Sequence, residues 1–361
     1  MVDDGHDLVI IGAGVVGAAI AAAAADGRRS VLVLEAGARE GGGVTSRNSG
    51  VIHSGLYYPP TSRKARTCLR GQALLYAWAA DHGVAHARTG KLVVARSLDH
   101  VAALEALAAN AAAAGAQGLR LCDGAEAAAL EPALPTVAAA LWCPNTGVVD
   151  PHGLTRSLRA AAERQGAIFA LRAPVTAITP TSGGFAVESG DDVVLAGAVV
   201  NAAGLEADRV AAMIGVDEFT IYPCRGDYFR LRARGRYRRL VYPVRPPGSP
   251  GLGVHLTLEL DGGVRLGPDA EYVDARDDFR PRADKHAAFH AAAEALLGPI
   301  DPDDLRYDGC GIRPKLRAPG EAAERDFVVH VGPAGCVHLI GIESPGLTAA
   351  LALAEEVVGL L

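Results

Sequence analysis

The chain has 361 residues, more than one hydrophobic core usually supports, so two domains of about 150 to 200 residues each are expected. Half of the residues are apolar and 21% are charged, which is typical of a globular protein and argues against long disorder. The net charge of -6 argues against a nucleic-acid-binding protein, and the basic residues within 225–239 alternate with acidic and aromatic ones.

The first 35 residues predict a strand, a helix and a second strand. Residues 8–11 form a short aliphatic run typical of a buried parallel strand, and residues 15–25 carry the small apolar side chains of a closely packed helix. Residues 31–34 form the second aliphatic run. Acidic rather than basic residues precede this apolar segment, so we expect a buried folding unit and not a signal peptide or a membrane span.

The turn between the first strand and the helix carries a glycine pattern typical of dinucleotide sites. In such a site the first glycine permits a tight turn, the second lets the backbone approach a pyrophosphate, and the third lets helix pack on strand. The helix N-terminus offers amides to the anion, and an acidic residue about 20 positions later binds a ribose. The alternative is a packing turn with a surface glutamate. The order of the parts favours a nucleotide site formed by Gly12, Gly14, Val15, Val16, Gly17, Glu35 and Ala36.

The rest of the chain alternates between predicted helices and short strands. The glycine-rich stretch 37–55 is too long for a simple connection, so we expect it to carry function. Residues 64–82 predict a helix, and alanine content favours helices over residues 101–114, 125–130 and 287–297. Strands are predicted over residues 167–170, 184–187, 193–200, 228–231, 240–244, 253–260 and 264–266, the last four in an antiparallel sheet. Residues 337–361 predict a strand, a turn and a final helix.

The glycine pattern alone does not separate NAD from FAD, and two features favour FAD. The unit stands at the N-terminus, and the chain closes with Gly341-Ile-Glu-Ser-Pro-Gly346-Leu-Thr348 at the start of the last helix. The partial positive charge of that helix N-terminus would stabilise the negative charge that reduction places on a flavin. We therefore predict an α/β fold with a Rossmann-like FAD-binding domain (1–89, 141–210 and 308–361). A second, α+β substrate-binding domain on a mostly antiparallel sheet would hold residues 90–140 and 211–307.

The cysteines are scattered along the chain, and no two of them form a Cys-x-x-Cys pair. We therefore expect neither a zinc site nor any other metal, and no disulfide framework. A reduced, cytoplasmic setting is predicted, with any membrane contact peripheral and at the inner face. The residues are Cys68, Cys122, Cys143, Cys224, Cys310 and Cys336.

Motifs spread over nearly the whole chain carry a family resemblance. They are Thr45-Ser-Arg-Asn-Ser-Gly-Val-Ile-His-Ser-Gly-Leu-Tyr-Tyr58, Lys64-Ala-Arg-x-Cys68, Gly90-Lys-Leu, Gly147-Val-Val-Asp150, Gly311-Ile-Arg-Pro-Lys-Leu316, Asp326-Phe-Val and Gly341 to Thr348. Together they resemble the D-amino-acid oxidase (DAO) superfamily of FAD-dependent oxidoreductases. Within it the chain is most similar to L-2-hydroxyglutarate dehydrogenases and oxidases.

The resemblance implies which residues hold the flavin. Small residues suit close backbone approach, while Asn and Ser donate or accept hydrogen bonds, although turn capping is the alternative for Asn48 and Ser49. His53 and Cys68 lie in or near the flavin loop, where a covalent link could form, but we expect a dissociable FAD. The expected FAD contacts beyond the first unit are Arg47, Asn48, Ser49, Gly50, Val175, Ala203, Gly204, Gly311, Arg313, Ser344, Pro345, Gly346, Leu347 and Thr348.

Oxidation of an alcohol beside a carboxylate needs a base for the hydroxyl proton and a cation for the acid group. His255, on a predicted strand of the second domain, is the preferred base, and His53 is the other candidate; either one could instead be a structural histidine. Arg313 matches the position of the superfamily's carboxylate-binding arginine, and Lys315 could serve a second acid group or the flavin. Weaker pocket candidates are Lys64, Arg225, Tyr242 and Thr257.

Three functions are compatible with these residues. The first is oxidation of a small 2-hydroxyacid, L-2-hydroxyglutarate above others, to the 2-oxoacid by hydride transfer to flavin. The second is an amino-acid or amine oxidase of the same superfamily, for which a neutral amine needs no strong base. The third is a non-catalytic FAD-binding subunit, which the polar pocket residues argue against. A small anionic substrate is expected in either enzyme, while the electron acceptor stays open among oxygen, a quinone and a carrier protein.

Overall fold

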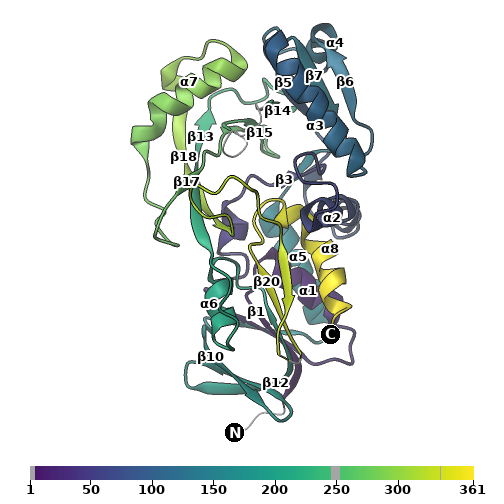
Figure 1. Cartoon of the computed structure of the whole chain (residues 1–361), viewed down its shortest axis with the longest axis vertical. Helices are drawn as coiled ribbons and strands as arrows, with labels where there is room; N and C mark the ends of the chain where they lie inside the picture. The colour runs from purple at the N-terminus through teal and green to yellow at the C-terminus, as the bar shows by residue number, and fades with distance from the viewer. Residues whose placement is uncertain (1–4, 245–252, 334) are drawn as a thin grey trace.

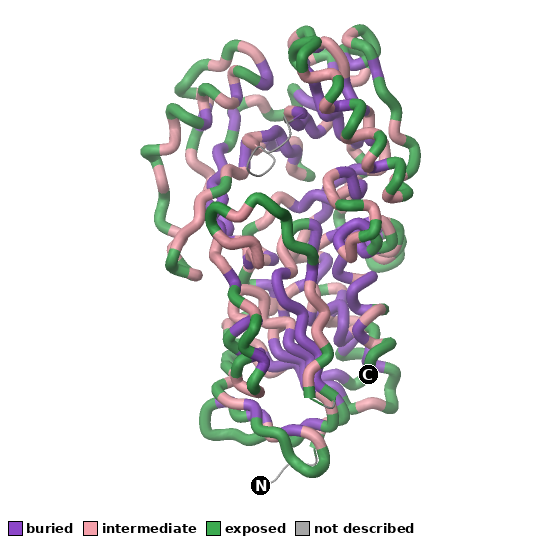
Figure 2. Tube along the Cα trace, in the orientation of Figure 1, coloured by how far each residue is buried: buried purple, intermediate pink, exposed green. Residues whose placement is uncertain are grey.

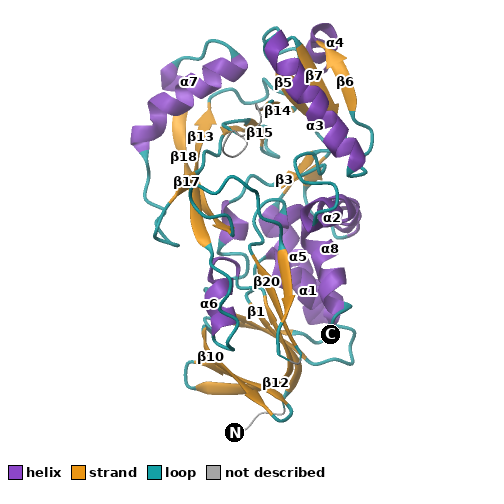
Figure 3. Ribbon diagram, in the orientation of Figure 1, coloured by secondary structure: helices purple, strands orange, loops and turns teal. Residues whose placement is uncertain are grey.

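Residues 5–244, 253–333 and 335–361 are described by the structure, a computed structural model. The chain forms an elongated molecule with one sheet in the lower half, near the N-terminus, and a second sheet in the upper half (Figure 1). Helix α7 stands on one side of the upper sheet, and α3 and α4 stand on the other (Figure 3). The predicted α/β fold is thus confirmed.

The predicted strand, helix and strand unit is present as β1 (His6–Ile11), α1 (Val15–Ala24) and β2 (Val31–Glu35). β1 pairs in parallel with β2 on one side and with β12 (Asp192–Asn201) on the other. Residues 8–11 are all buried, which explains an aliphatic run without polar alternation. The central position of β1 places its carboxyl end, and the glycine turn after it, in the middle of the sheet.

The remaining strands of this sheet extend it toward both edges. β9 (Ile168–Leu171) pairs in parallel with β2. β11 (Gly184–Ser189) and β20 (Cys336–Ile340) pair with successive halves of β12, and β10 (Val175–Thr181) and β19 (Val328–Val331) pair with them in turn. Burial is concentrated in the central strands of this sheet (Figure 2).

Four helices from separate parts of the chain pack together beside the sheet. α8 (Gly346–Val358) contacts both α1 and α2 (Arg63–Asp81), and α5 (Pro151–Arg164) contacts α1. The small residues predicted to allow close packing in α1 are buried at these contacts. We did not predict α5, although Asp150 caps its N-terminus and Pro151 opens its first turn, which are recognised helix-start signals.

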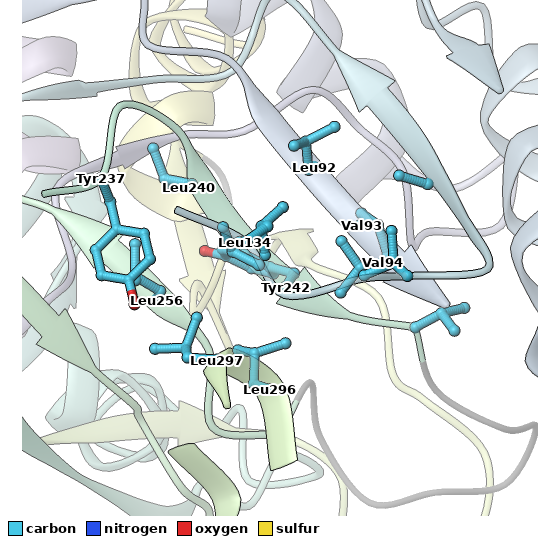
Figure 4. Close-up of a cluster of buried hydrophobic side chains, with 14 of the residues drawn as sticks. Leu92, Val93, Val94, Leu134, Tyr237, Leu240, Tyr242, Leu256, Leu296 and Leu297 are labelled. Carbon is cyan, nitrogen blue, oxygen red and sulfur yellow. The ribbon is translucent and has the colours of Figure 1, made fainter. Parts of the chain in front are cut away.

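The second sheet is mostly antiparallel, as predicted, with β5 and β14 as a parallel pair. Its core brings together strand residues such as Leu92, Leu240 and Leu256 with Leu296 and Leu297 of α7 (Figure 4). In sheet order its strands are β17 (Glu271–Tyr272), β13 (Tyr222–Leu231), β16 (Val264–Leu266), β15 (Leu256–Leu258), β14 (Leu240–Pro243), β5 (Lys91–Ala95), β7 (Ala139–Cys143) and β6 (Arg120–Asp123), with β18 (Leu305–Lys315) also paired to β13.

A small third sheet consists of β3 (Val51–Ile52), β8 (Gly147–Val149) and β4 (His86–Ala87). The other α-helices are α3 (Val101–Ala113), α4 (Gly124–Leu130), α6 (Ala207–Ala212) and α7 (His286–Leu297). Short 3-10 turns are η1 (Val44–Arg47), η2 (Leu98–His100), η3 (Gly204–Glu206), η4 (Ala283–Lys285) and η5 (Pro302–Asp304).

Sheet membership runs past two of the domain boundaries expected from the sequence. β7 crosses residue 141 and β18 crosses residue 308, yet both strands pair within the second sheet. β18 is therefore shared: it belongs to the upper sheet, while its carboxyl end lies beside the lower domain. Among the described helices, none is both long and apolar enough to cross a membrane.

Candidate active site

A cavity of about 1040 Å³ lies where the two sheets meet. It exceeds the roughly 300–1,000 Å³ of ordinary small-molecule pockets, as a dinucleotide together with a substrate would require. The residues lining it come from the first glycine turn, the end of β2, the 43–64 segment, β13, β14, β18 and the turn before α8. Most of the predicted site residues line it: Gly12, Gly14, Val15, Val16, Glu35, Ala36, Arg47, Asn48, Ser49, His53, Lys64, Val175, Ala203, Gly204, Tyr242, His255, Gly311, Arg313, Lys315, Ser344, Pro345, Gly346 and Leu347.

The glycine turn at the end of β1 has the shape that a dinucleotide needs. Gly12 has a φ of +102°, and a Cβ there would lie 2.6 Å from the carbonyl oxygen of Ala202. A Cβ on Gly17 would lie 1.9 Å from the carbonyl oxygen of Gly12, so helix and strand touch at this point. Gly17 therefore supports the turn without lining the cavity. The glycines add no side chains where a pyrophosphate would approach, although the N–H of Val15 at the start of the helix donates to the Thr45 hydroxyl at 3.0 Å.

Glu35 ends β2 at the cavity edge, held by two backbone amides. Its carboxylate accepts hydrogen bonds from the N–H of Ala13 and the N–H of Gly37, both at 2.7 Å. Each carboxylate oxygen has a second lone-pair site, so ribose hydroxyls can still donate to it. The residues present therefore fit the ADP half of FAD.

The loop after η1 is fixed by its own polar side chains and by the second sheet. Asn48 donates to the carbonyl of Thr45 at 2.7 Å and accepts from the N–H of Gly50 at 2.6 Å, so it caps this turn. The hydroxyl of Ser49 lies 3.0 Å from that of Tyr228 on β13. Asn48 and Ser49 thus do turn-forming work while also lining the cavity, and Gly50 lies just outside it.

His255 stands on the second-sheet wall of the cavity and is buried. Its ring stacks on Tyr242 with a centroid distance of 3.8 Å. Its Nδ1 lies 2.7 Å from the carbonyl oxygen of Gly253, and because a carbonyl only accepts, Nδ1 carries the proton. In the neutral ring the basic lone pair therefore belongs to Nε2, which is the tautomer that a general base requires.

His53 follows the loop that carries Asn48 and Ser49 and also lines the cavity. Its backbone N–H donates to the Thr348 hydroxyl at 3.0 Å, and its Nε2 lies 3.3 Å from the Ser344 hydroxyl. Burial, and after it the electrostatic influence of Lys91 and of the neighbouring His255, lowers the pKa of His53 to about 3. His53 is therefore neutral at physiological pH. Thr348 does not line the cavity but ties the start of α8 to this loop, since its hydroxyl also donates to the carbonyl of Val51.

Arg313 extends from β18 into the cavity without a carboxylate partner among the described residues. Its guanidinium donates to the backbone carbonyl of Asp269 at 3.0 Å and lies 3.9 Å from the sulfur of Cys224. The neighbouring strand leaves room for it at Gly226, where a Cβ would lie 2.5 Å from an Arg313 nitrogen. A half-buried guanidinium without an anionic partner is expected to take one from a ligand.

Asp269, whose carbonyl holds Arg313, is itself fixed by a buried charge network. Its carboxylate accepts from the N–H of Asp227 and from Lys285, both at 2.7 Å, and Lys285 also pairs with Asp227. Arg225 pairs with the same Asp227 at 2.7 Å. The network fixes the loop that carries Asp269 and so the orientation of Arg313.

Lys64 and Lys315 share one buried carboxylate. Their ammonium groups lie 3.1 and 2.9 Å from the two oxygens of Glu343, and all three side chains are at most 14% exposed. Burial opposes the charge of Glu343, but the two lysines outweigh it and lower the pKa of the carboxyl group. The cluster therefore carries one net positive charge at the cavity wall.

Arg225 was wrong as a substrate-binding prediction. Along β13, Gly226 and Tyr228 line the cavity, so the alternation of a strand turns Arg225 and Asp227 to the opposite face. There Arg225 is 1% exposed and also donates to the carbonyls of Asp278 and Arg280.

Two more residues near the site do not reach the cavity. Thr257 is buried beyond His255, against Tyr242. Cys68 is fully buried, and burial raises the pKa of its thiol to about 12, so it does not have the reactive form that attachment to a flavin would need.

Other residues of the site had no role in the sequence analysis. Tyr57 and Tyr58 belong to a motif that we quoted, and both line the cavity together with Tyr228. Lys91 lies directly behind two of the lining tyrosines. The quoted motifs contained Tyr57, Tyr58 and Lys91, but nothing in the sequence placed them beside the cavity.

Comparisons with known proteins agree with this geometry. The family model described as DAO, FAD dependent oxidoreductase, matches residues 7–360. A mitochondrial L-2-hydroxyglutarate dehydrogenase of Arabidopsis thaliana is 33% identical over 401 residues, which cover 97% of this chain and 82% of the relative. An L-2-hydroxyglutarate dehydrogenase of Salmonella houtenae is 34% identical over 284 residues, covering 77% of this chain and 67% of the relative.

Solved structures share the fold. An L-alpha-glycerophosphate oxidase from Mycoplasma pneumoniae, dithionite reduced and with FAD bound, superposes with a TM-score of 0.90 at 24% identity and covers 99% of this chain and 95% of its own. Glycine oxidase from Geobacillus kaustophilus gives a TM-score of 0.84 at 22% identity, with coverages of 98% and 94%. At these identities the likeness speaks for the fold alone.

Proposed function

Because this chain belongs to the DAO family of FAD-dependent oxidoreductases, we propose that it oxidises L-2-hydroxyglutarate, a small 2-hydroxyacid, to the 2-oxoacid. FAD is the cofactor, held at the glycine turn and Glu35. Bound FAD supplies the two-electron acceptor for the hydride that leaves C2 of the substrate. The observation that carries the proposal is that two residues line the same cavity: His255, whose Nδ1 carries the proton, and Arg313, which has no carboxylate partner among the described residues.

The residues divide the work as follows. Arg313 binds the carboxylate next to the reacting carbon, with a fork of donors that fixes its orientation. As the C2–H bond breaks, the hydroxyl proton passes to Nε2 of His255, and the C–O bond becomes a carbonyl. The hydrogen bond from Nδ1 to Gly253 holds the ring in the proton-accepting tautomer. His53 and the turn before α8 also line the cavity.

The second acid group of the substrate has a place beside the first. Arg313 and Lys315 are two residues apart on β18 and face the same cavity, and at about 3.3 Å per residue their positions are about 7 Å apart. This spacing is comparable to that of the two carboxylates in a five-carbon diacid. The net positive charge of Lys64, Lys315 and Glu343 favours an anion there.

An amino-acid or amine oxidase is the alternative, and His255 argues against it. A neutral amine already carries the lone pair that drives hydride loss, so that reaction needs no base beside the reacting atom. The dissociable FAD and a cytoplasmic location, with any membrane contact peripheral and at the inner face, stay predictions. The electron acceptor stays open among oxygen, a quinone and a carrier protein.

Anaerobic visible absorbance tests the proposal directly. L-2-hydroxyglutarate should bleach the flavin spectrum of the purified protein, while other 2-hydroxyacids and a panel of 2-amino acids should do so weakly or not at all. Bleaching by an amino acid alone would instead support the alternative. Acid precipitation should leave the flavin in solution, and flavin in the pellet would show covalent attachment.

A further inference from the structure

Lys91 is a buried lysine that the proposed reaction does not yet use. It lies on β5 and is 1% exposed. No ion pair of the described residues includes it, and burial lowers the pKa of its ammonium group. Its thiol neighbours Cys68 and Cys143 are neutral, since burial raises their pKa to about 12 and about 11. An isolated buried ammonium costs free energy, so its presence calls for a compensating role.

The charge of Lys91 is held by two aromatic rings of the cavity wall. Its Nζ lies 4.6 Å from the ring centroid of Tyr242 and 5.1 Å from that of Tyr57. Both distances suit cation–π contacts, which a desolvated site strengthens. Both tyrosines line the cavity, so the ammonium contacts rings that also border the space that the substrate would occupy.

The same wall carries the proton-accepting histidine. The ring of His255 stacks on Tyr242 at a centroid distance of 3.8 Å, so Lys91 and His255 contact a common ring. The charge of Lys91 also adds to burial in lowering the pKa of His53, which lines the same cavity. Lys91 therefore acts electrostatically on His53, which it does not touch, and it shares the ring of Tyr242 with His255.

A dicarboxylate substrate creates a need for such a charge. Two carboxylates in a closed cavity favour the protonated form of any nearby imidazole, and a protonated His255 cannot accept the hydroxyl proton. Of the other cations near the proposed substrate position, Lys64 and Lys315 share Glu343 and keep one net positive charge for the second carboxylate, and Arg313 binds the first. Within the part of the chain that the structure describes, no carboxylate pairs with Lys91, and Lys91 does not line the cavity.

We propose that Lys91 is a positioning residue of the active site, whose positive charge, held between Tyr57 and Tyr242, keeps His255 and His53 neutral when the anionic substrate is bound. This inference rests on the proposed oxidation of a dicarboxylate. It assigns a role in the reaction to a residue buried behind the cavity wall.

Histidine NMR of the FAD-loaded protein tests the proposal without turnover. The ring signals of His255 and His53, assigned with His255→Gln and His53→Gln, are titrated in the wild type, Lys91→Met and Lys91→Arg. In Lys91→Met, His255 should titrate on the order of one pH unit higher, as expected for the loss of one nearby charge. Lys91→Arg retains the charge and should leave the titration where it is in the wild type.

The titration is repeated with 2-oxoglutarate, a dianion that no step consumes. If it fails to shift any ring signal, the proposed substrate class is in doubt, but the comparison of Lys91→Met with Lys91→Arg still decides the role of Lys91. An unchanged titration in Lys91→Met, or equal shifts in both variants, would overturn the inference.

The rate of flavin reduction by L-2-hydroxyglutarate should fall at acidic pH, and in Lys91→Met this fall should begin at a higher pH. At pH values below the pKa of His255, flavin reduction in Lys91→Met should be roughly tenfold slower than in Lys91→Arg. The difference between the two rates should decrease as the pH rises. Removing an isolated buried charge should not lower thermal stability. A Lys91→Met protein that does not fold, or a loss of rate equal at every pH, would mean a structural role and contradict the proposal.

Discussion

The two ends of the cavity are built in different ways. The nucleotide end, made of the β1–α1 turn and Glu35, uses backbone groups and contacts within the first 37 residues, with Ala202 closing the turn. The substrate end, made of β13, β14, β18 and His255, uses charged side chains from distant segments, each held by another charge or carbonyl. Cofactor binding at the nucleotide end therefore depends on the shape of the backbone. Substrate binding and oxidation at the substrate end depend on which charged side chains have no partner of opposite charge.

The largest effect is expected at the nucleotide end. Gly17→Ala places a Cβ 1.9 Å from the carbonyl oxygen of Gly12, so the turn must open and FAD should be lost. The flavin-to-protein absorbance ratio of the purified variant should fall at least about tenfold. Gly43→Ala is the control, because Gly43 also lines the cavity but a Cβ there would meet no atom within 4 Å. Equal flavin contents in the two variants would contradict a shape-determined site.

Removal of the proposed base should affect chemistry and not cofactor binding. His255→Ala should retain FAD yet reduce it roughly 10²–10⁴-fold more slowly, the range typical of a lost general base. Anaerobic stopped-flow absorbance at saturating L-2-hydroxyglutarate measures this rate. His100→Ala, which alters a histidine outside the cavity, should reduce FAD at the wild-type rate. If His255→Ala does the same, the base lies elsewhere.

Removal of Arg313, the proposed carboxylate-binding residue, should have a smaller effect than removal of His255, and the effect should be on substrate affinity. Arg313→Ala should raise the half-saturating concentration of L-2-hydroxyglutarate by about 100-fold, because a charge-assisted contact in a partly buried site is removed. Arg313→Lys keeps the charge without the fork of donors and should recover part of the affinity. Steady-state kinetics with flavin content as the reference measure both. Normal substrate affinity in Arg313→Ala would mean that a residue other than Arg313 binds the carboxylate.

The smallest expected effect tests whether the strand beside Arg313 positions its guanidinium. Gly226→Ala puts a Cβ 2.5 Å from an Arg313 nitrogen and 2.8 Å from Pro268, so the guanidinium must shift. Affinity for the substrate should fall roughly three- to tenfold. In the double variant with Arg313→Ala the second change should add nothing, since both act through one group. Additive losses would mean that Gly226 acts on the fold and not on Arg313.

The different origins of the two ends explain which predictions held. The aliphatic runs, the glycine spacing and the acidic residue of the nucleotide end lie close together in the chain, so their pattern already predicted a strand, a turn and a helix, and the structure confirmed them. At the substrate end a one-residue shift along β13 decides which face a side chain takes. The sequence does not mark that register, and Arg225 was therefore assigned to the cavity when Gly226 and Tyr228 line it.

The sequence by itself therefore determined the fold class, the cofactor turn and the residue types from which the site is built. Only the tertiary structure decided which of its cations are neutralised. Lys64 and Lys315 look equivalent to Arg313 in the sequence, yet both pair with Glu343. The hydrogen bonds of Arg313 to described residues go to a backbone carbonyl and a thiol. Lys91 lies behind two tyrosine rings instead of in the cavity. Charge pairing depends on distances of a few Å between side chains hundreds of residues apart, and local sequence patterns do not encode those distances.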